Sequence, residues 1–222
     1  MRLKIDFDIK NLKVNRVARF FILADFLLFG GWGFIGPVFA VFVLNQVPGS
    51  TLLTLGIVAA IYWIVKSVIQ IPVALYLDHH DGERDDFNAL VLSLMLAGFA
   101  AISFLLVHST PQLYLVVFLQ AVAFGLYTPS WSALFSRHLD REHFSFDWSL
   151  DSTSVGIASG ITGLLGGAFA GFFGFSSVFI IGSLLSFIGA FSLLSVPNII
   201  FPPKTGMPET GLRDHAPGAP LK

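Results

Sequence analysis

The chain of 222 residues is 55% hydrophobic and only 12% charged, with a mean hydropathy of +0.77. A soluble domain would carry about twice that share of charged residues, so the composition excludes an ordinary soluble fold. The net charge of −1 gives no basis for a nucleic-acid partner, and the absence of cysteine excludes disulfides, cysteine metal sites and thiol catalysis.

The first sixteen residues alternate between apolar and polar side chains. We interpret residues 1–16 as a cytoplasmic N-terminal segment that is interfacial or poorly ordered rather than an added strand. The segment does not resemble a signal peptide, because the apolar run from Val17 is too long and Asp25 interrupts it without a small-residue cleavage site.

Six apolar stretches follow, and each is long enough to cross a hydrocarbon core, which needs about 20 residues. The sequence therefore predicts an all-α polytopic membrane protein, with a six-helix transmembrane domain over residues 17–197. The expected spans are 17–44, 51–77, 88–107, 113–136, 150–173 and 176–197. The last residues, 198–222, hold five prolines together with glycines and charges, which is typical of a flexible cytoplasmic tail.

The basic residues fall on only one side of these spans. Twelve of the thirteen lie at the N-terminal end, in the connections 78–87 and 137–149, or in the tail, and the other is Lys66 in the second span. The connections on the opposite side, 45–50, 108–112 and 174–177, contain neither lysine nor arginine. By the positive-inside rule both termini are cytoplasmic, and we expect the cell (inner) membrane as the location.

Three polar side chains lie inside the spans, where a charge costs about 3 kcal/mol or more. Asp25 either forms an ion pair or a capping contact near the interface, for example with Arg19, or binds a proton or cation that is coupled to transport. Lys66 either extends its ammonium towards the interface or faces a watery cavity or a partner carboxylate, and we favour the second interpretation. Gln120 is either a contact between helices or a substrate ligand.

Glycine and proline interrupt the first span between Gly30 and Pro37 and the fourth span at Pro129, which is typical of kinks and cavity linings. The candidate substrate or coupling residues are Asp25, Lys66, Gln120, Trp32, Tyr62 and Tyr127. The fifth span carries a glycine stripe that serves either static helix packing or a seam along which helices slide. Its members are Gly156, Gly160, Gly163, Gly167 and Gly171.

The end of the second span resembles a motif of the major facilitator superfamily, Gly-x-x-x-Asp-Arg-x-Gly-Arg-Arg. Ala74 stands at the place of the first glycine, Asp78 at the aspartate, and Gly82 comes one residue late before Arg84. Basic residues of the motif are largely replaced by acidic ones. Together with six spans, cytoplasmic ends and a glycine-rich fifth span, this resembles one half of such a transporter over roughly residues 17–197.

The resemblance implies functions for several residues. In the family this loop joins the cytoplasmic ends of the two halves, so Asp78, Gly82 and Arg84 become candidates for a gating loop. Proton-coupled drug exporters of the family carry an arginine in the fourth helix and a glycine–proline signature in the fifth. The stretch 115–125 has only Gln120, and 156–174 has no proline, which argues against proton-driven drug antiport.

A complete transporter of this family has two six-helix halves. The second half could be another copy of the chain, a different chain, or the remainder of a protein of which this is a fragment. We favour a parallel homodimer because both ends of a half lie on one side, although the charge count does not forbid antiparallel pairing.

Function is therefore expected to be secondary transport of a small solute by alternating access. The alternative is a non-transporting membrane scaffold or a partner subunit of another six-helix chain. An enzyme is not expected, and neither is a cofactor or a metal, because His79 and His80 lack further ligands at metal-site spacing. Asp147 and Asp151 lie near the start of the fifth helix, where acidic groups favour the helix dipole rather than forming a catalytic pair.

Overall fold

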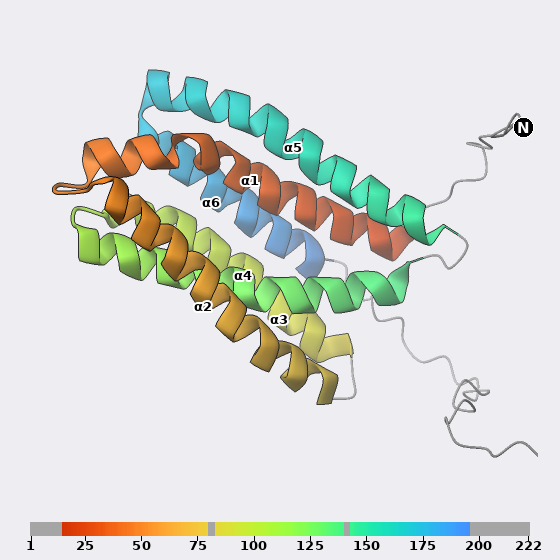
Figure 1. Cartoon of the computed structure of the whole chain (residues 1–222). Helices are drawn as coiled ribbons and strands as arrows, with labels where there is room; N and C mark the ends of the chain where they lie inside the picture. The colour runs from red at the N-terminus through yellow and green to blue at the C-terminus, as the bar shows by residue number, and fades with distance from the viewer. Residues whose placement is uncertain (1–14, 80–82, 140–142, 196–222) are drawn as a thin grey trace, which may run out of the picture.

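The computed structural model describes residues 15–79, 83–139 and 143–195, and the regular structure over these residues is helical. Each of six helices is long and apolar enough to cross a membrane, which confirms the predicted all-α, six-span fold. The helices are α1 (Arg16–Gln46), α2 (Leu52–His79), α3 (Glu83–Ser103), α4 (Thr110–His138), α5 (Phe144–Phe173) and α6 (Phe175–Leu194), with a short 3-10 turn, η2 (Phe104–Leu106), after α3 (Figure 1).

The helix ends differ from the prediction where the connections are charged. α3 begins at Glu83 and α5 at Phe144, so the predicted connections 78–87 and 137–149 are too long. Acidic residues in the first turn of α3 interact favourably with the helix N-terminus, so charge does not end this helix. The predicted segments 1–16 and 198–222 lie almost entirely outside the described residues, as does Gly82.

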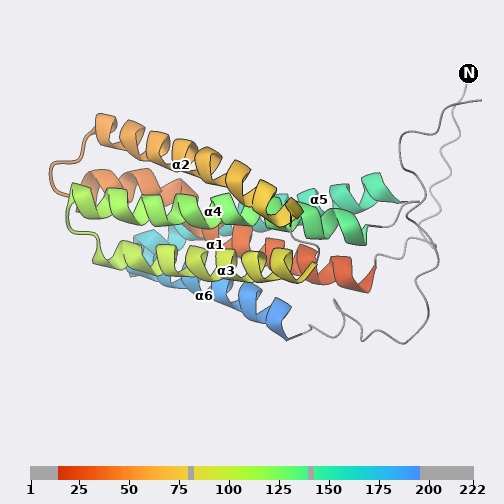
Figure 2. The same ribbon diagram turned by 90° about the horizontal axis from the view of Figure 1, so that it is seen from below.

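The uncharged connections are short, as expected. Gly174 alone separates α5 from α6 with a φ of +78°, a left-handed conformation that favours glycine, and its N–H donates to the carbonyl of Ala170 at 3.1 Å. The connections 47–51 and 107–109 lie at the same end of the bundle (Figure 2). The N-terminus of α1 and the C-terminus of α6 therefore lie at the opposite end.

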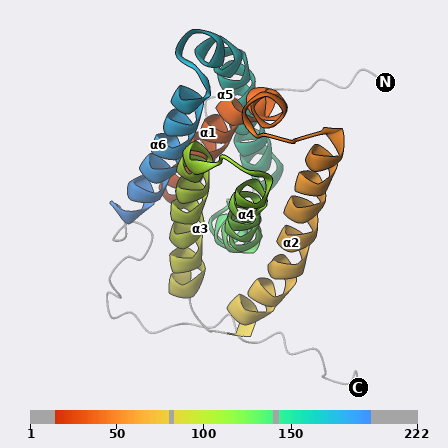
Figure 3. The same cartoon turned by 90° about the vertical axis from the view of Figure 1, so that its left-hand side faces the viewer.

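The helices pack in a pattern that repeats after three helices. α1 packs on α5 and α6, α4 packs on α2 and α3, and α3 and α6 pack on each other. Exchanging helices 1–3 for helices 4–6 leaves this pattern unchanged, which indicates an internal two-fold repeat. α1 and α4 are thereby neighbours within one face of the bundle, with α5 beyond α1 and α2 beyond α4 (Figure 3).

α2 and α5 are buried far less than the other helices. In the most apolar stretch of each, only 11% of the residues are buried, against 44–50% in the other four spans. Large apolar side chains such as Ile64 on α2 and Leu164 on α5 are exposed. These two helices therefore present apolar surface that lipid or further helices must cover.

Glycines set how closely α1 approaches its neighbours. A Cβ atom at Gly31 would lie 2.7 Å from the carbonyl oxygen of Gly182 on α6. A Cβ atom at Gly166 on α5 would lie 2.9 Å from the Cα atom of Phe34. Both distances are shorter than real Cβ contacts, so only glycine allows the two helices to pack this closely on α1.

Candidate functional site

A pocket of about 350 Å³ lies between α1, α2 and α4 and is lined mainly by apolar and aromatic side chains. Trp32 and Phe39 on α1 are seven residues apart, and Leu55 and Tyr62 on α2 have the same spacing. Residues at this spacing share one face of a helix, so each helix presents one continuous wall to the pocket. Gln120 on α4 adds an amide, and the pocket thus brings together three of the predicted site residues.

The polar groups of the pocket include a buried donor without a partner. Nε1 of Trp32 is buried and has no hydrogen-bond partner among the described residues. An unsatisfied buried donor of this kind costs about 1–3 kcal/mol. Trp32, Tyr62 and Gln120 are each partly buried and able to form hydrogen bonds.

Lys66 lies one turn beyond Tyr62 on α2 and is partly buried. Its Nζ lies 5.2 Å from the ring centroid of Trp63 and 6.0 Å from that of Tyr62. Both distances are in the range of cation–π attraction. No ion pair of Lys66 exists within the part of the chain that the structure describes. The ammonium is therefore held at the edge of the pocket by two rings that also line it.

Asp25 lies in a different place, beside Asp151 of α5. Both side chains are buried, and they lie close enough for their charges to interact. Oδ1 of each has no hydrogen-bond partner among the described residues. The expected ion pair with Arg19 is not formed there, because residues six positions apart lie on different faces of a helix.

Asp151 was not anticipated as a neighbour of Asp25. Because α5 begins at Phe144, Asp147 is in its first turn, where the dipole interpretation applies, whereas Asp151 is one turn further along. Only the packing of α5 on α1 brings the two carboxylates together, and no sequence pattern reports that contact.

Tyr127 is buried but does not line the pocket. Its ring stacks on that of Trp131 at 6.4 Å, and its hydroxyl has no partner within the described residues. Phe124 connects this pair to the pocket, because its ring contacts Trp32 at 5.4 Å, Tyr62 at 6.1 Å and Tyr127 at 6.1 Å. Phe124, which the sequence did not single out, is therefore the shared packing element of the site.

Two of the predicted gating residues, Asp78 and Arg84, lie at the end of the bundle opposite the 47–51 connection. Asp78 is exposed in the last turn of α2, and Arg84 is exposed in the first turn of α3. A half-buried ion pair lies close by, in which Nη1 of the exposed Arg137 on α4 donates to Oδ2 of the buried Asp86 on α3. At this end of the bundle Asp86 thus has an ion-pair partner in Arg137. The short connection between α3 and α4 could have indicated this pair, because it places the first turn of α3 and the last turn of α4 at the same end.

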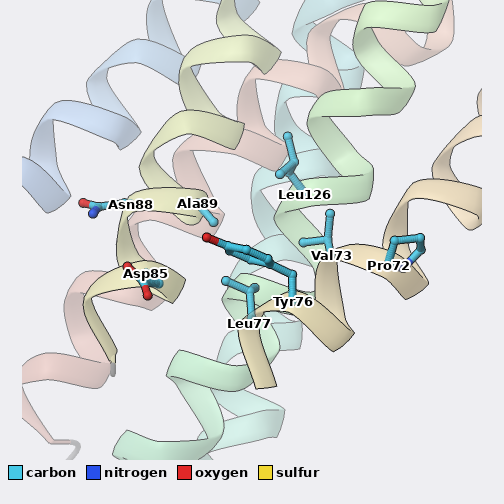
Figure 4. Close-up of a pocket in the computed structure, with 8 residues that line it drawn as sticks. All are labelled: Pro72, Val73, Tyr76, Leu77, Asp85, Asn88, Ala89 and Leu126. Atoms are coloured by element: carbon cyan, nitrogen blue, oxygen red, sulfur yellow. The ribbon is translucent and has the colours of Figure 1, made fainter. Parts of the chain in front are cut away.

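A second pocket, of about 530 Å³, opens between the ends of α2 and α3. Tyr76 and Leu77 of α2 face Asp85 and Ala89 of α3, and the Tyr76 hydroxyl points towards α3 (Figure 4). Its lining includes a carboxylate but none of the predicted substrate residues. We therefore place the candidate site in the smaller pocket, which Trp32, Tyr62 and Gln120 line and beside which the Lys66 ammonium lies.

The glycine stripe of α5 is divided between two surfaces. Gly163 faces α1, since a Cβ atom there would lie 3.5 Å from Cγ of Pro37, and Gly166 makes the closest contact with that helix. The other members of the stripe would meet no described atom within 4 Å; they are Gly156, Gly160, Gly167 and Gly171. Most of the stripe thus faces away from its own bundle.

Comparisons with known proteins agree with this architecture. The Major Facilitator Superfamily sequence model matches residues 21–217. The fold is similar to that of the POT family transporter PepTSo, seen in an in meso crystal structure, with a TM-score of 0.64 and 16% sequence identity. That similarity covers 83% of this chain and 38% of PepTSo, so the chain spans well under two thirds of that protein. No curated protein matches the sequence. Because the family match extends over most of its length, this six-helix membrane protein belongs to the Major Facilitator Superfamily.

Proposed function

We propose that the protein is a secondary transporter that carries a small solute across the membrane by alternating access. The solute would bind in the pocket between α1, α2 and α4, with Lys66 as its electrostatic anchor. The observation that carries this proposal is a pocket lined by Trp32 and Gln120, with the Lys66 ammonium over the rings of Tyr62 and Trp63 at its edge. Polar groups within membrane spans are expensive, and they mark substrate pathways more often than structural contacts.

The same proposal includes a second six-helix half that covers α2 and α5. Their shallow burial and the outward-facing glycines of α5 support this, because both features suit close contact with further helices. We assign the second half to another copy of the chain, in a parallel homodimer with cytoplasmic termini in the inner membrane. The mass of the complex in nanodiscs, measured by native mass spectrometry, should equal two copies. A mass of one copy would assign the second half to another polypeptide.

Coupling and gating belong to the other end of the bundle in this proposal. Asp25, beside Asp151, would bind the coupling proton or cation, since neither carboxylate has a basic partner among the described residues. Asp78 and Arg84, which flank Gly82, would act in the gate between the halves. These assignments rest on burial and position, together with the motif at the end of α2.

Alternating access can be tested without knowing the solute. Because the chain contains no cysteine, single cysteines can be introduced at Ala40 and Ala59, two exposed positions that line the pocket. A membrane-impermeant maleimide is then applied to one side or the other of sealed vesicles. The transporter should react at both positions from either side, as its two conformations open the pocket in turn.

A cysteine at Ile188 provides the matched control, because this residue is exposed on α6, which does not line the pocket, and it should react from neither side. Labelling of the pocket cysteines from one side only, or from neither, would contradict alternating access. That outcome would favour the alternative of a membrane scaffold or partner subunit.

A further inference from the structure

We propose that the pocket between α1, α2 and α4 selects a small aromatic monocarboxylate. This inference rests on the proposed function, since it names the chemical class of solute for the same pocket. Three features carry it, namely the isolated positive charge of Lys66, the excess of hydrogen-bond donors, and the aromatic walls of a small cavity.

Lys66 does not line the pocket, but it is the charge beside it, because its Nζ lies 5.2 Å from the ring centroid of Trp63, which does line it. Between residues 26 and 77, which include every pocket residue of α1 and α2, Lys66 is the single charged side chain. The pocket residues contributed by α4, Val117 and Gln120, are uncharged. A cationic ligand would meet repulsion with no carboxylate of this chain nearby, whereas one carboxylate would balance the ammonium. One compensating charge suits a monoanion rather than a dianion or a cation.

The hydrogen-bonding groups point to the same class. The ammonium of Lys66 offers three donors, the indole of Trp32 one and the amide of Gln120 two. A carboxylate accepts at four lone-pair sites and donates none, so it matches a site rich in donors. Nε1 of Trp32 has no partner among the described residues and almost no accessible surface, so the indole would have to rotate to donate to a ligand acceptor. Charge-assisted bonds of this kind are stronger than those to a neutral amide.

The walls and the size of the pocket define the rest of the ligand. Trp32, Phe39, Tyr62 and Trp63 present rings to a cavity whose remaining lining is mainly aliphatic. Rings attract a flat aromatic body through edge-to-face and offset-stacked contacts. A volume of about 350 Å³ is near the lower end of the usual range for ligand sites, so the body should be one or two rings.

Three probes of similar size and different charge test the inference on the full chain in nanodiscs. They are phenylacetate, neutral phenylacetamide and cationic phenethylamine. Binding is followed by tryptophan fluorescence, because Trp32 and Trp63 line the pocket, and by calorimetry. Phenylacetate should bind about tenfold more tightly than the amide, as expected for a charge-assisted hydrogen bond, and the amine should not bind.

Variants at one position separate charge from shape. Lys66→Gln should reduce phenylacetate affinity to that of the amide and leave amide binding unchanged, whereas Lys66→Arg should keep the preference for the acid. Gln70→Leu is the matched control on the same helix, since Gln70 is partly buried and lies one turn further from the pocket residues of α2 than Lys66, and it should change nothing.

Equal binding of acid and amide, full phenylacetate affinity in Lys66→Gln, or no binding of any probe would overturn the assignment of the solute class. Failure of the proposed function has a different signature. If the pocket cysteines react from both sides but the three probes bind without a charge preference, alternating access is supported and the assigned solute class is wrong. If the acid binds more tightly than the amide but the cysteines react from one side only, the solute class is supported and alternating access is contradicted.

Discussion

Two adjacent glycines of α5 provide the sharpest test of how α5 packs on α1. Gly166 is buried against Phe34 of α1, whereas Gly167 faces open space. Gly166→Ala and Gly167→Ala add the same methyl group to the same helix, one residue apart. In the detergent-purified monomer, where no second copy covers Gly167, their difference therefore reports the α1–α5 contact and not the chemistry of the substitution.

The expected magnitude follows from the space at each position. A Cβ atom at Gly166 would lie 2.9 Å from Cα and 3.0 Å from the carbonyl carbon of Phe34, so a backbone must shift. Overpacking of this kind costs about 1–3 kcal/mol. At Gly167 no described atom lies within 4 Å, and alanine gains up to about 1 kcal/mol of helix propensity there. Gly166→Ala gains the same helix propensity, so this gain cancels, and the two variants should differ by about 1–3 kcal/mol in their free energy of unfolding.

The assay is thermal unfolding of the detergent-purified chain, followed by intrinsic tryptophan fluorescence. For a chain of this size the difference corresponds to roughly 2–12 °C between the midpoints, with Gly166→Ala the lower. If Gly166→Ala unfolds at or above the midpoint of Gly167→Ala, α5 does not approach α1 as closely as described, and the reasoning fails.

Two further substitutions probe buried charges. Arg137→Ala leaves Asp86 buried without its partner and should cost about 1–3 kcal/mol, less than for a fully buried pair because the Arg137 side chain is 41% exposed. Adding Asp86→Asn should recover most of that loss in the same thermal assay, and no recovery would mean that the ion pair is not the cause. Asp25→Asn should keep or raise the unfolding midpoint, because the carboxylate it replaces is buried with an unpartnered oxygen. A marked drop in that midpoint would reveal a partner that the structure does not show.

The fold was predictable because the dominant signal is local. Six apolar runs separated by turn residues define six helices without any knowledge of their neighbours. α3 and α5 begin earlier in the chain than predicted, because apolar residues mark only the part of a helix that lies in the hydrocarbon core. Backbone hydrogen bonding continues each helix into the polar interface. The start of α3 at Glu83 shows this, as its acidic first turn is stabilised by the helix dipole.

The individual residues of the site could be predicted from the sequence, but their grouping in space could not. Lys66 and Gln120 stand out in the sequence because polar groups are costly in a span, and each could be named without a structure. Their grouping depends on α2 packing against α4, and the meeting of Asp25 with Asp151 depends on α5 packing against α1. Helices that are not consecutive in the chain make both contacts, so neither follows from spacing along a single helix.

The two polar sites have opposite charge, and this sets an expectation for the energetics of transport. The ammonium of Lys66 stands beside the pocket, whereas Asp25 and Asp151 form an acidic pair between α1 and α5. An anion in the pocket and one proton or monovalent cation on the carboxylates would move together without net charge. An inside-negative potential opposes entry of a lone anion by about 2.3 kcal/mol per 100 mV. Uptake of phenylacetate into proteoliposomes should therefore be insensitive to an imposed potassium-diffusion potential. The contrary result is that an inside-negative potential inhibits phenylacetate uptake, and does so equally in Asp25→Asn. The anion would then cross alone, and the carboxylates would not couple it to a cation.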